Sequence, residues 1–330
     1  MGILLARYLQ NTSDPAVEHS LQLFRSYLYR ELFDRETGMV YNDICRNNDQ
    51  PRLYNYPWAA EFFMEIFRLY RNPEYLESMY RALMAFYRNG GQRMYAIEIP
   101  VVDSLELLYE NREYKKREEL LACYRRHADF MLETGLNYPA HEVNYEQSIV
   151  APGVDFLLQV YQVTREEKYL EMAGTQMRIL ELFNGTQPDW HMYETAIRHW
   201  DGYWFGKRRM YGDTFPHYWS ALTGNVFLRY AEITGDTAWK KRGEDSLRVV
   251  LGLYKIKKPQ VKAGKGCIGS DGEANAFDVE ASCAFVYPRT VNGKPACFMD
   301  PWANDQDWGM YFYLREVDYI YLDGKSARII

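Results

Sequence analysis

Apolar residues recur at spacings of three and four along most of the chain, which is the spacing of amphipathic helices. A first stripe runs from Asp14 to Phe33, and a hairpin or loop is expected over 34–43. A strongly apolar helix is predicted over Tyr56 to Tyr70. Asn72-Pro73 then begins its amphipathic successor, predicted over Glu74 to Tyr87. The unit of the chain is therefore a pair of helices, one apolar and one amphipathic.

This pair returns three more times, with tight connectors inside each pair and long connectors between pairs. The apolar members are Ile99 to Tyr109, Ile149 to Val163 and Phe215 to Ile233, and their amphipathic mates are Tyr114 to Leu132, Glu166 to Phe183 and Thr237 to Tyr254. An apolar helix inside and its mate outside give two concentric rings. The predicted fold class is therefore all-α, an (α/α)6-type toroid, with residues 1–330 forming a single domain.

The pattern supplies about five inner and five outer helices, fewer than a complete ring of six pairs needs. The last inner helix is expected near Asp305 to Arg315. The ring is thus either open or closed by the helix at Asp14 to Phe33. A late loop carries Asn292-Gly293 between two apolar runs, which predicts a β-hairpin with a two-residue turn.

Every long connector leads into an inner helix, so all of them gather at the end of the toroid where the inner helices have their N-termini. Loops on a rigid scaffold commonly carry function, so this end is the expected active face. Free backbone N–H groups and the positive ends of the helix dipoles favour anionic ligands there.

The stretch from His191 to Trp219 mixes charged and aromatic side chains more densely than any other window. Surface helices rarely hold so many aromatics, and a sealed core would not hold so many charges. A groove that stacks on sugar rings requires both. The candidate substrate-binding residues, from this stretch and two neighbouring loops, are Tyr145, His199, Trp200, Trp204, Arg208, Arg209, His217, Tyr218 and Trp308.

Three carboxyl groups are the candidate catalytic residues, because glycoside hydrolysis needs one carboxyl to protonate the leaving oxygen and a second to activate water or attack the sugar. Glu146 is the predicted general acid, Asp213 its partner and Asp201 the reserve. Each also has a structural interpretation. Glu146 suits a cap or a salt bridge, Asp213 an N-cap for a helix from Phe215, and Asp201 a turn.

The basic run Lys207-Arg208-Arg209 lies inside this aromatic stretch rather than on an outer helix. Its guanidinium groups can bind a substrate carboxylate through two parallel hydrogen bonds. Such runs also occur as ordinary solvated surface. The aromatic residues, likewise, are explained either by sugar stacking or by the normal lining of a toroid.

The helical alternation, with turns such as Thr234-Gly235-Asp236, resembles the six-hairpin glycosidase superfamily. The stretches NYEQS (144–148), HWDGYWFGKRRMYGDTFPHYWS (199–220) and NDQDWGMYF (304–312) look most like glycoside hydrolase family 154. That resemblance implies exo-acting β-glucuronidase activity on uronic-acid-capped glycans. The chain is short for six full hairpins and lacks an added β-domain, in which it departs from the family.

Four functions follow from these features. The first is a uronic-acid-directed glycoside hydrolase. The second is a polysaccharide lyase in which His217 or Tyr218 removes the proton α to a carboxyl group that arginine neutralises. The third is a toroid that binds glycans or a protein without catalysis, and the fourth is a sugar epimerase. The ultraviolet absorbance of an unsaturated product separates the lyase from the hydrolase.

Composition narrows the partners. The net charge of −6 argues against a general nucleic-acid binder, and no apolar run is long enough to span a membrane. The five cysteines form no CxxC pair or metal spacing, so neither a metal nor a cofactor is predicted. The expected partner is an oligosaccharide or polysaccharide bearing uronic acid, and self-association into a homo-oligomer stays open. The chain shows no secretory signal, which suits the cytoplasm, or the periplasm or exterior if a signal peptide has been removed.

Overall fold

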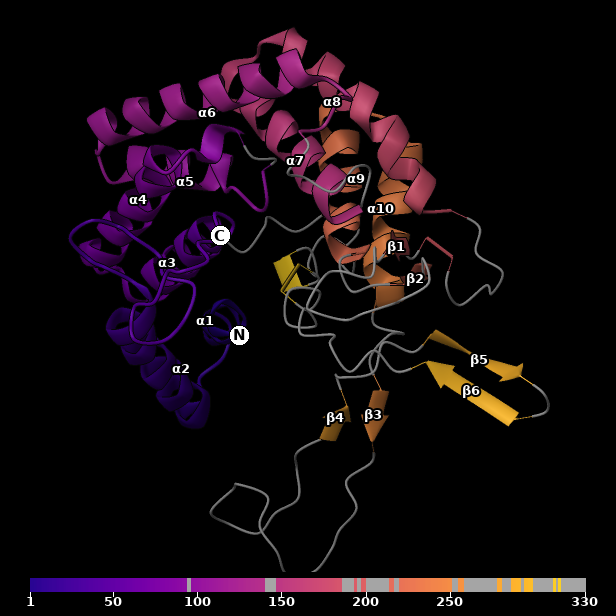
Figure 1. Ribbon diagram of the computed structural model, residues 1–330, viewed down its shortest axis with the longest axis horizontal. Helices are drawn as coiled ribbons and strands as arrows, with labels where there is room; N and C mark the ends of the chain where they lie inside the picture. Colours follow the sequence, from indigo (N-terminus) through magenta and orange to yellow (C-terminus); the bar gives the residue numbers. More distant parts are fainter. Residues whose placement is uncertain are drawn as a thin grey trace, which may run out of the picture.

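The computed structural model is helical and is built mainly as hairpins of two helices (Figure 1). It describes residues 1–93, 96–139, 147–185, 193–194, 197–199, 214–216, 220–250, 255–257, 278–280, 286–291, 294–298, 311–312 and 314–315. Helices far apart in the sequence lie side by side in two layers, which confirms the predicted α/α toroid.

Four hairpins follow one another around the arc, and in each the inner helix packs on the outer helix that comes next in the chain. The inner helices are α3 (Asn55–Tyr70), α5 (Val101–Glu110), α7 (Gln147–Thr164) and α9 (Ser220–Thr234). The outer helices are α4 (Pro73–Arg88), α6 (Tyr114–Thr134), α8 (Glu167–Leu180) and α10 (Thr237–Val249). The inner helix α7 also packs on both α5 and α9, so these three helices form one side of the toroid.

The N-terminal hairpin corrects the predicted ring. The chain begins with α1 (Gly2–Leu9), which the sequence pattern did not indicate, followed by α2 (Pro15–Tyr27) and a π-helical turn (Leu28–Leu32). α1 packs on the inner helix α3 as well as on α2. The approach is so close that a Cβ on Gly2 would lie 2.2 Å from the Phe24 ring. The predicted helix at Asp14 to Phe33 is therefore the second member of a further hairpin, α1 and α2, and whether it closes the ring stays a prediction.

Three of the outer helices begin at the predicted places, each after a residue whose side chain caps the helix. The Asp14 carboxylate accepts hydrogen bonds from the backbone N–H groups of Ala16 and Val17 at 3.0 and 3.2 Å. Asn72 and Asp236 cap α4 and α10 in the same way. Because capping side chains satisfy N–H groups that the helix itself leaves unpaired, these residues fix the start of each outer helix.

The segment before α9 differs from the prediction. A helix was expected from Phe215, but α9 begins at Ser220, and Thr214–Pro216 form strand β2 instead. β2 pairs antiparallel with β1 (Ile197–His199). Proline favours an extended conformation in the residue before it, which suits Phe215 to a strand. An Asp213 that caps a helix starting at Phe215 is thus excluded.

Two further ladders lie in the late part of the chain. β3 (Lys255–Lys257) pairs with β4 (Asp278–Glu280), and β5 (Val286–Val291) pairs with β6 (Lys294–Phe298). Val291 opposes Lys294, so positions 292 and 293 connect the two strands, which confirms the predicted hairpin. The helix predicted to reach Tyr254 ends earlier, at Val249.

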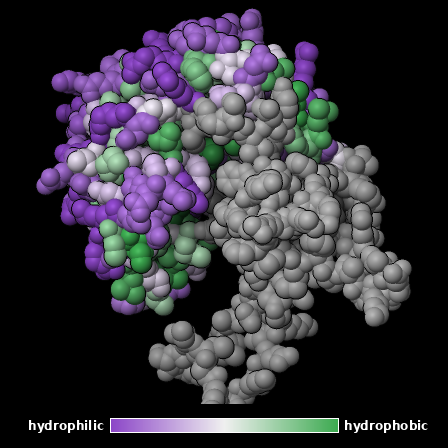
Figure 2. Space-filling model, in the orientation of Figure 1, coloured by the Kyte–Doolittle hydropathy of each residue, from purple (hydrophilic) through white to green (hydrophobic). Residues whose placement is uncertain are grey.

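The visible surface divides by polarity. Hydrophilic residues cover most of the outer helices, whereas hydrophobic residues gather over the α2 end of the arc (Figure 2). Within the described ranges, no helix combines the length and the apolar character that a membrane span requires.

Candidate active site

The residues predicted to act on substrate can be placed only in part. Glu146, Asp201, Asp213, Tyr145, Trp200, Trp204, Arg208, Arg209, His217, Tyr218 and Trp308 lie outside the described residues. His199 is placed by its backbone alone, as the last residue of β1 opposite Thr214. The structure therefore neither brings these side chains together nor separates them, and their roles stay predictions.

The N-terminal ends of α7 and α9 carry buried polar side chains, as the predicted active face requires. Gln147, the first residue of α7, is fully buried, and its Nε2 donates a hydrogen bond to Thr223 Oγ1 of α9 at 2.7 Å. Ser148, which follows Gln147 in α7, and Ser220, the first residue of α9, are buried as well. Polar groups are costly to bury without partners, so these two helix ends are held in a fixed relation.

A larger polar group lies on α3, inside an otherwise apolar sequence. Glu61, Glu65 and Arg68 are spaced by four and three residues, which places them on one face of the helix. The two carboxyl groups are almost completely buried. The hydroxyl of Tyr311, from the late helical segment, lies 3.0 Å from Glu61 Oε2 and 3.2 Å from Glu65 Oε1. A segment 246 residues away in sequence is thereby tied to α3 by hydrogen bonding.

Arg68 joins α3 to α5. Its guanidinium lies 2.8 Å from Glu65 Oε1 and 3.4 Å from Asp103 Oδ2. Burial alone would raise the pKa of Asp103, but the charges of Arg68, Arg315 and Arg229 outweigh it and hold the pKa at about 2. Asp103 is therefore ionised at any physiological pH.

The inner helices α7 and α9 are joined by a second ion pair. Arg229 Nε lies 2.7 Å from Asp155 Oδ1, and its Nη1 donates to Gln162 Oε1 at 2.7 Å. Gln159 donates to Asp155 Oδ2 at 2.6 Å and accepts a hydrogen bond from the backbone N–H of Val102 at 3.2 Å. The start of α5 is thus fixed to the same network.

Glu98 completes the group, two residues before Pro100 and the start of α5. Burial is the main cause that raises its pKa well above the ordinary value, and the charge of Asp155 raises it further. The charges of Arg315 and Arg229 act in the opposite direction. We call the whole set the axial cluster; its members are Glu61, Glu65, Arg68, Glu98, Asp103, Asp155, Arg229, Tyr311 and Arg315.

The axial cluster is balanced in charge when two of its carboxyl groups are protonated. Arg68, Arg229 and Arg315 offset three carboxylates, and the remaining two acids, Glu61 and Glu98, have raised pKa values. Protonated carboxyl groups near neutral pH can donate hydrogen bonds or protons, which ionised ones cannot. Buried guanidinium groups beside them suit an anionic substrate. Perturbed pKa values of this kind cluster at functional sites, although structural ion-pair networks produce them as well.

Glu61 gives a testable consequence of this balance. Burial is the main cause that raises its pKa to about 7, with Arg315 opposing and Asp103 adding to the rise. A carboxyl group whose pKa rises on folding stabilises fully below its unfolded pKa of 4.5 and progressively less as pH climbs through 7. We expect Glu61→Gln to be more stable than the wild type by up to about 3 kcal/mol at pH 8.

Urea unfolding at pH 5 and pH 8 measures this effect. The gain should shrink to less than about 1 kcal/mol at pH 5, because Glu61 is then protonated in the folded protein and only the unfolded chain, with its pKa of 4.5, still ionises. Glu133→Gln, an exposed glutamate of α6, is the control and should change stability at neither pH. A Glu61→Gln protein that is less stable at pH 8 would show that the ionised carboxylate is the form the fold requires.

Glu194 anchors the long segment between α8 and α9. Its carboxylate is buried and bound by both Nε and Nη2 of Arg242 in α10, at 3.0 and 3.4 Å. Its carbonyl accepts hydrogen bonds from Asn184, Ser220 and Ser246. Glu194 therefore has a structural role. Its contacts with Arg242, Asn184, Ser220 and Ser246 fix the start of the stretch in which the aromatic and basic candidates lie.

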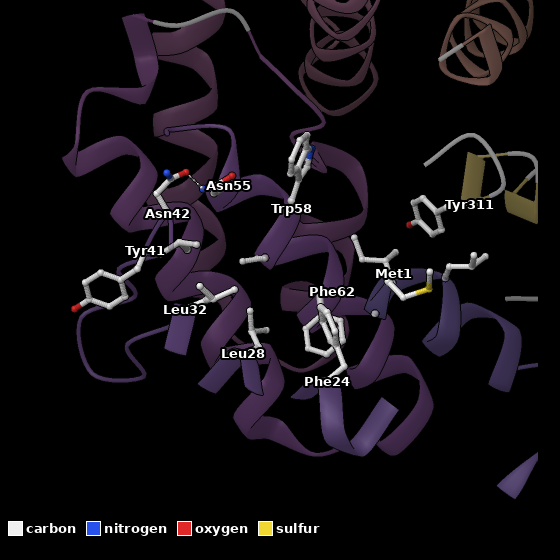
Figure 3. A pocket seen from close by; sticks show the side chains of 15 residues that line it. Met1, Phe24, Leu28, Leu32, Tyr41, Asn42, Asn55, Trp58, Phe62 and Tyr311 are labelled. Carbon is white, nitrogen blue, oxygen red and sulfur yellow. Dashed lines mark hydrogen bonds between the residues drawn. The ribbon is translucent and has the colours of Figure 1, made fainter. Parts of the chain in front are cut away.

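A separate apolar pocket of about 360 Å³ lies between α1, α2 and α3 (Figure 3). Phe24, Leu28, Phe62 and Trp58 face it, and Asn55 donates a hydrogen bond to Asn42 at its edge at 3.3 Å. Tyr311 lines this pocket while its hydroxyl binds the axial cluster. Among the described residues, the pocket lining contains no carboxyl, histidine or basic side chain.

No family model matches the chain, and no curated protein matches it. Solved structures do match. The chain is 39% identical to a polysaccharide lyase over 95% of its length, with a TM-score of 0.76, and covers 43% of that protein. It thus spans less than half the length of this relative.

Two epimerases share the architecture at much lower identity. A cellobiose 2-epimerase from Bacillus thermoamylovorans aligns with 95% of this chain at 12% identity, with a TM-score of 0.55, over 86% of its own chain. A sugar epimerase from a ruminal bacterium aligns with 99% at 10% identity, with a TM-score of 0.55, also over 86% of its own chain. These structures confirm the toroid and the resemblance to the six-hairpin glycosidase fold. They lend no support to glycoside hydrolase family 154 in particular.

Proposed function

We propose that this chain is the helical part of a glycan-processing enzyme and that its reaction is β-elimination at a uronic acid residue. The observation that carries the proposal is the 39% identity with a polysaccharide lyase along almost the whole chain. The similarity to a lyase therefore places elimination before hydrolysis, whereas the sequence alone placed hydrolysis first. The uronic acid itself is supported by the run Lys207-Arg208-Arg209 in the aromatic stretch.

To catalyse β-elimination, the protein must perform three chemical functions. The substrate carboxylate must be neutralised so that the C5 proton becomes acidic, a base must take that proton, and the leaving oxygen at C4 must receive one. His217 and Tyr218 stay the proposed bases. Tyr311 is unsuited to that role, because burial and the charge of Glu61 raise the pKa of its hydroxyl well above the ordinary value.

The substrate panel that tests this proposal contains polygalacturonate, alginate, glucuronan and heparin, beside neutral glucan and mannan. We expect ultraviolet absorbance to rise with at least one uronate polymer and with no neutral one, because elimination leaves a C4=C5 double bond conjugated to the carboxyl group. Reducing ends should form in equal number. Reducing ends without absorbance would show hydrolysis and overturn the lyase proposal.

Glycoside hydrolysis is the second candidate, and the raised pKa values of Glu61 and Glu98 favour it, since a general acid must be protonated near neutral pH. On this hypothesis Glu61 and Glu98 become candidates for the acid beside those that the sequence suggested, which are Glu146 as the acid, Asp213 as its partner and Asp201 as the reserve. Aryl glucuronides and galacturonides test this alternative directly. Release of the aryl group from uronides, and far less from neutral glycosides, would support it.

A further inference from the structure

Glu98 has features that its neighbours in the sequence do not explain. Its side-chain atom Oε1 is buried and accepts no hydrogen bond from the part of the chain that the structure describes. Its backbone has φ +54°, in the left-handed region that residues with a Cβ rarely adopt. Unpaired buried polar atoms and strained backbone both cluster at functional sites, where the surrounding structure maintains them.

The place of Glu98 in the toroid also points to a ligand. Glu98 ends the long connector that enters α5, at the predicted active face. The charged groups that act on it come from every inner element around it: Glu61 of α3, Asp155 of α7, Arg229 of α9, and Arg315 of the late segment. Its carboxyl group therefore lies within electrostatic reach of three inner helices and of the late segment.

Asn225 supplies a second, independent observation. It lies on α9, one helical turn before Arg229, and hence on the same face of that helix. Its side chain is only 6% exposed, and neither Nδ2 nor Oδ1 has a hydrogen-bond partner in the described part of the chain. The buried Oε1 of Glu98 and the buried amide of Asn225 are thus both without a partner in the described part of the chain, and both are available to a ligand.

We propose that Glu98 is a catalytic residue that binds the uronic acid carboxylate of the substrate as a protonated carboxyl, donating its O–H, with the Asn225 amide as a second donor. This inference rests on the proposed function. A carboxylate entering the axial cluster needs neutral or positive donors, because Arg68 and Arg229 are already paired with Glu65, Asp103 and Asp155. Protonated Glu98 receives the substrate without adding a negative charge.

The bound carboxylate then stabilises the elimination. As the base removes the C5 proton, the electrons of the C5–H bond move toward the carboxyl group, and the hydrogen bond from Glu98 strengthens as that charge grows. The C4=C5 double bond forms as the C4–O bond breaks, and the departing oxygen takes a proton from a general acid. Glu98 keeps its own proton throughout, and no oxidant or reductant is needed.

Substitutions at position 98 test the proposal with the uronate polymer that the wild type cleaves best. We expect Glu98→Ala to lower kcat/KM by about 10²–10³-fold, the cost of losing one such donor. Glu98→Gln should retain activity within about tenfold, because its amide N–H still donates. The wild-type rate should fall at high pH as Glu98 ionises, and Glu98→Gln should lose that alkaline decline. Glu110→Gln, an exposed glutamate at the end of α5, the helix that follows Glu98, is the matched control.

Binding measurements separate this inference from the proposed reaction. By calorimetry, Glu98→Ala should weaken binding of a glucuronate oligosaccharide at least tenfold relative to the wild type and leave its carboxyl-reduced counterpart unchanged. Equal weakening of both ligands, or rates equal to the Glu110→Gln control, would overturn the role of Glu98. A wild type that binds uronates but forms no unsaturated product would instead overturn the lyase function alone. If Glu98→Ala does not fold, Glu98→Gln and its pH profile still decide.

Discussion

Replacing Arg68 with methionine should lower the free energy of unfolding by about 3 kcal/mol or more, one of the largest effects expected for a single substitution in this chain. Methionine preserves much of the volume of the arginine stem but removes the charge. Glu65, almost completely buried, then loses its ion-pair partner at 2.8 Å, and Asp103 loses its partner in α3. A buried carboxylate without a cation must either stay ionised at high cost or take up a proton.

Urea unfolding measures this loss, and two further variants show its origin. Adding Glu65→Gln to Arg68→Met should restore part of the lost stability, because Glu65 then carries no unpaired charge, while Asp103 still lacks its partner in α3. Arg125→Met removes an exposed ion pair with Glu166 at 3.3 Å and should cost less than about 1 kcal/mol. A double variant that recovers none of the loss would show that the unpaired charge of Glu65 is not its cause.

The sequence predicted the toroid well, for a physical reason. Inner and outer helices differ in how much of their surface is buried, so their apolar patterns differ in width, and the observed bounds of α3 to α8 depart from the predicted ones by only a few residues. The pattern failed where it was short or ambiguous. α1 is only eight residues long, and the apolar run beginning at Phe215 fits a strand end as well as a helix start.

The axial cluster was missed in the sequence because several of its members are single charged residues within apolar stretches. Glu61 and Glu65 stand among phenylalanines, and Glu98 stands between two isoleucines. One signal could have revealed them: acidic and basic residues at positions i, i+4 and i+7 of a helix that is otherwise all apolar. Charges buried in this way must contact either charged partners or a ligand. The charged residues of the aromatic stretch were selected only because they are numerous within a short window. The sequence does not show which distant elements contact these charges. Tyr311, for example, reaches Glu61 and Glu65 from the late segment only through the tertiary fold.

The segment that follows α8 should depend on a single arginine. We expect Arg242→Met to cost about 3–5 kcal/mol, because Glu194 is only 2% exposed and Arg242 binds both of its oxygens. Arg242 also contacts Glu181 at 3.2 Å and lies over the rings of Phe227 and Trp239, so methionine loses these interactions as well.

Arg242→Lys separates the charge from its geometry. Lysine restores a positive charge but cannot reproduce the two parallel hydrogen bonds of the guanidinium, so its stability should fall between those of the wild type and Arg242→Met. Limited proteolysis locates the damage, and cleavage near positions 184–199 should accelerate more than cleavage in α3 to α6, since the Glu194 carbonyl also holds Asn184, Ser220 and Ser246. Uniform cleavage along the chain would contradict a local anchor. Activity should fall with the same variants even at temperatures where the helices stay folded, because the anchored segment leads directly into the stretch that carries the aromatic and basic candidates.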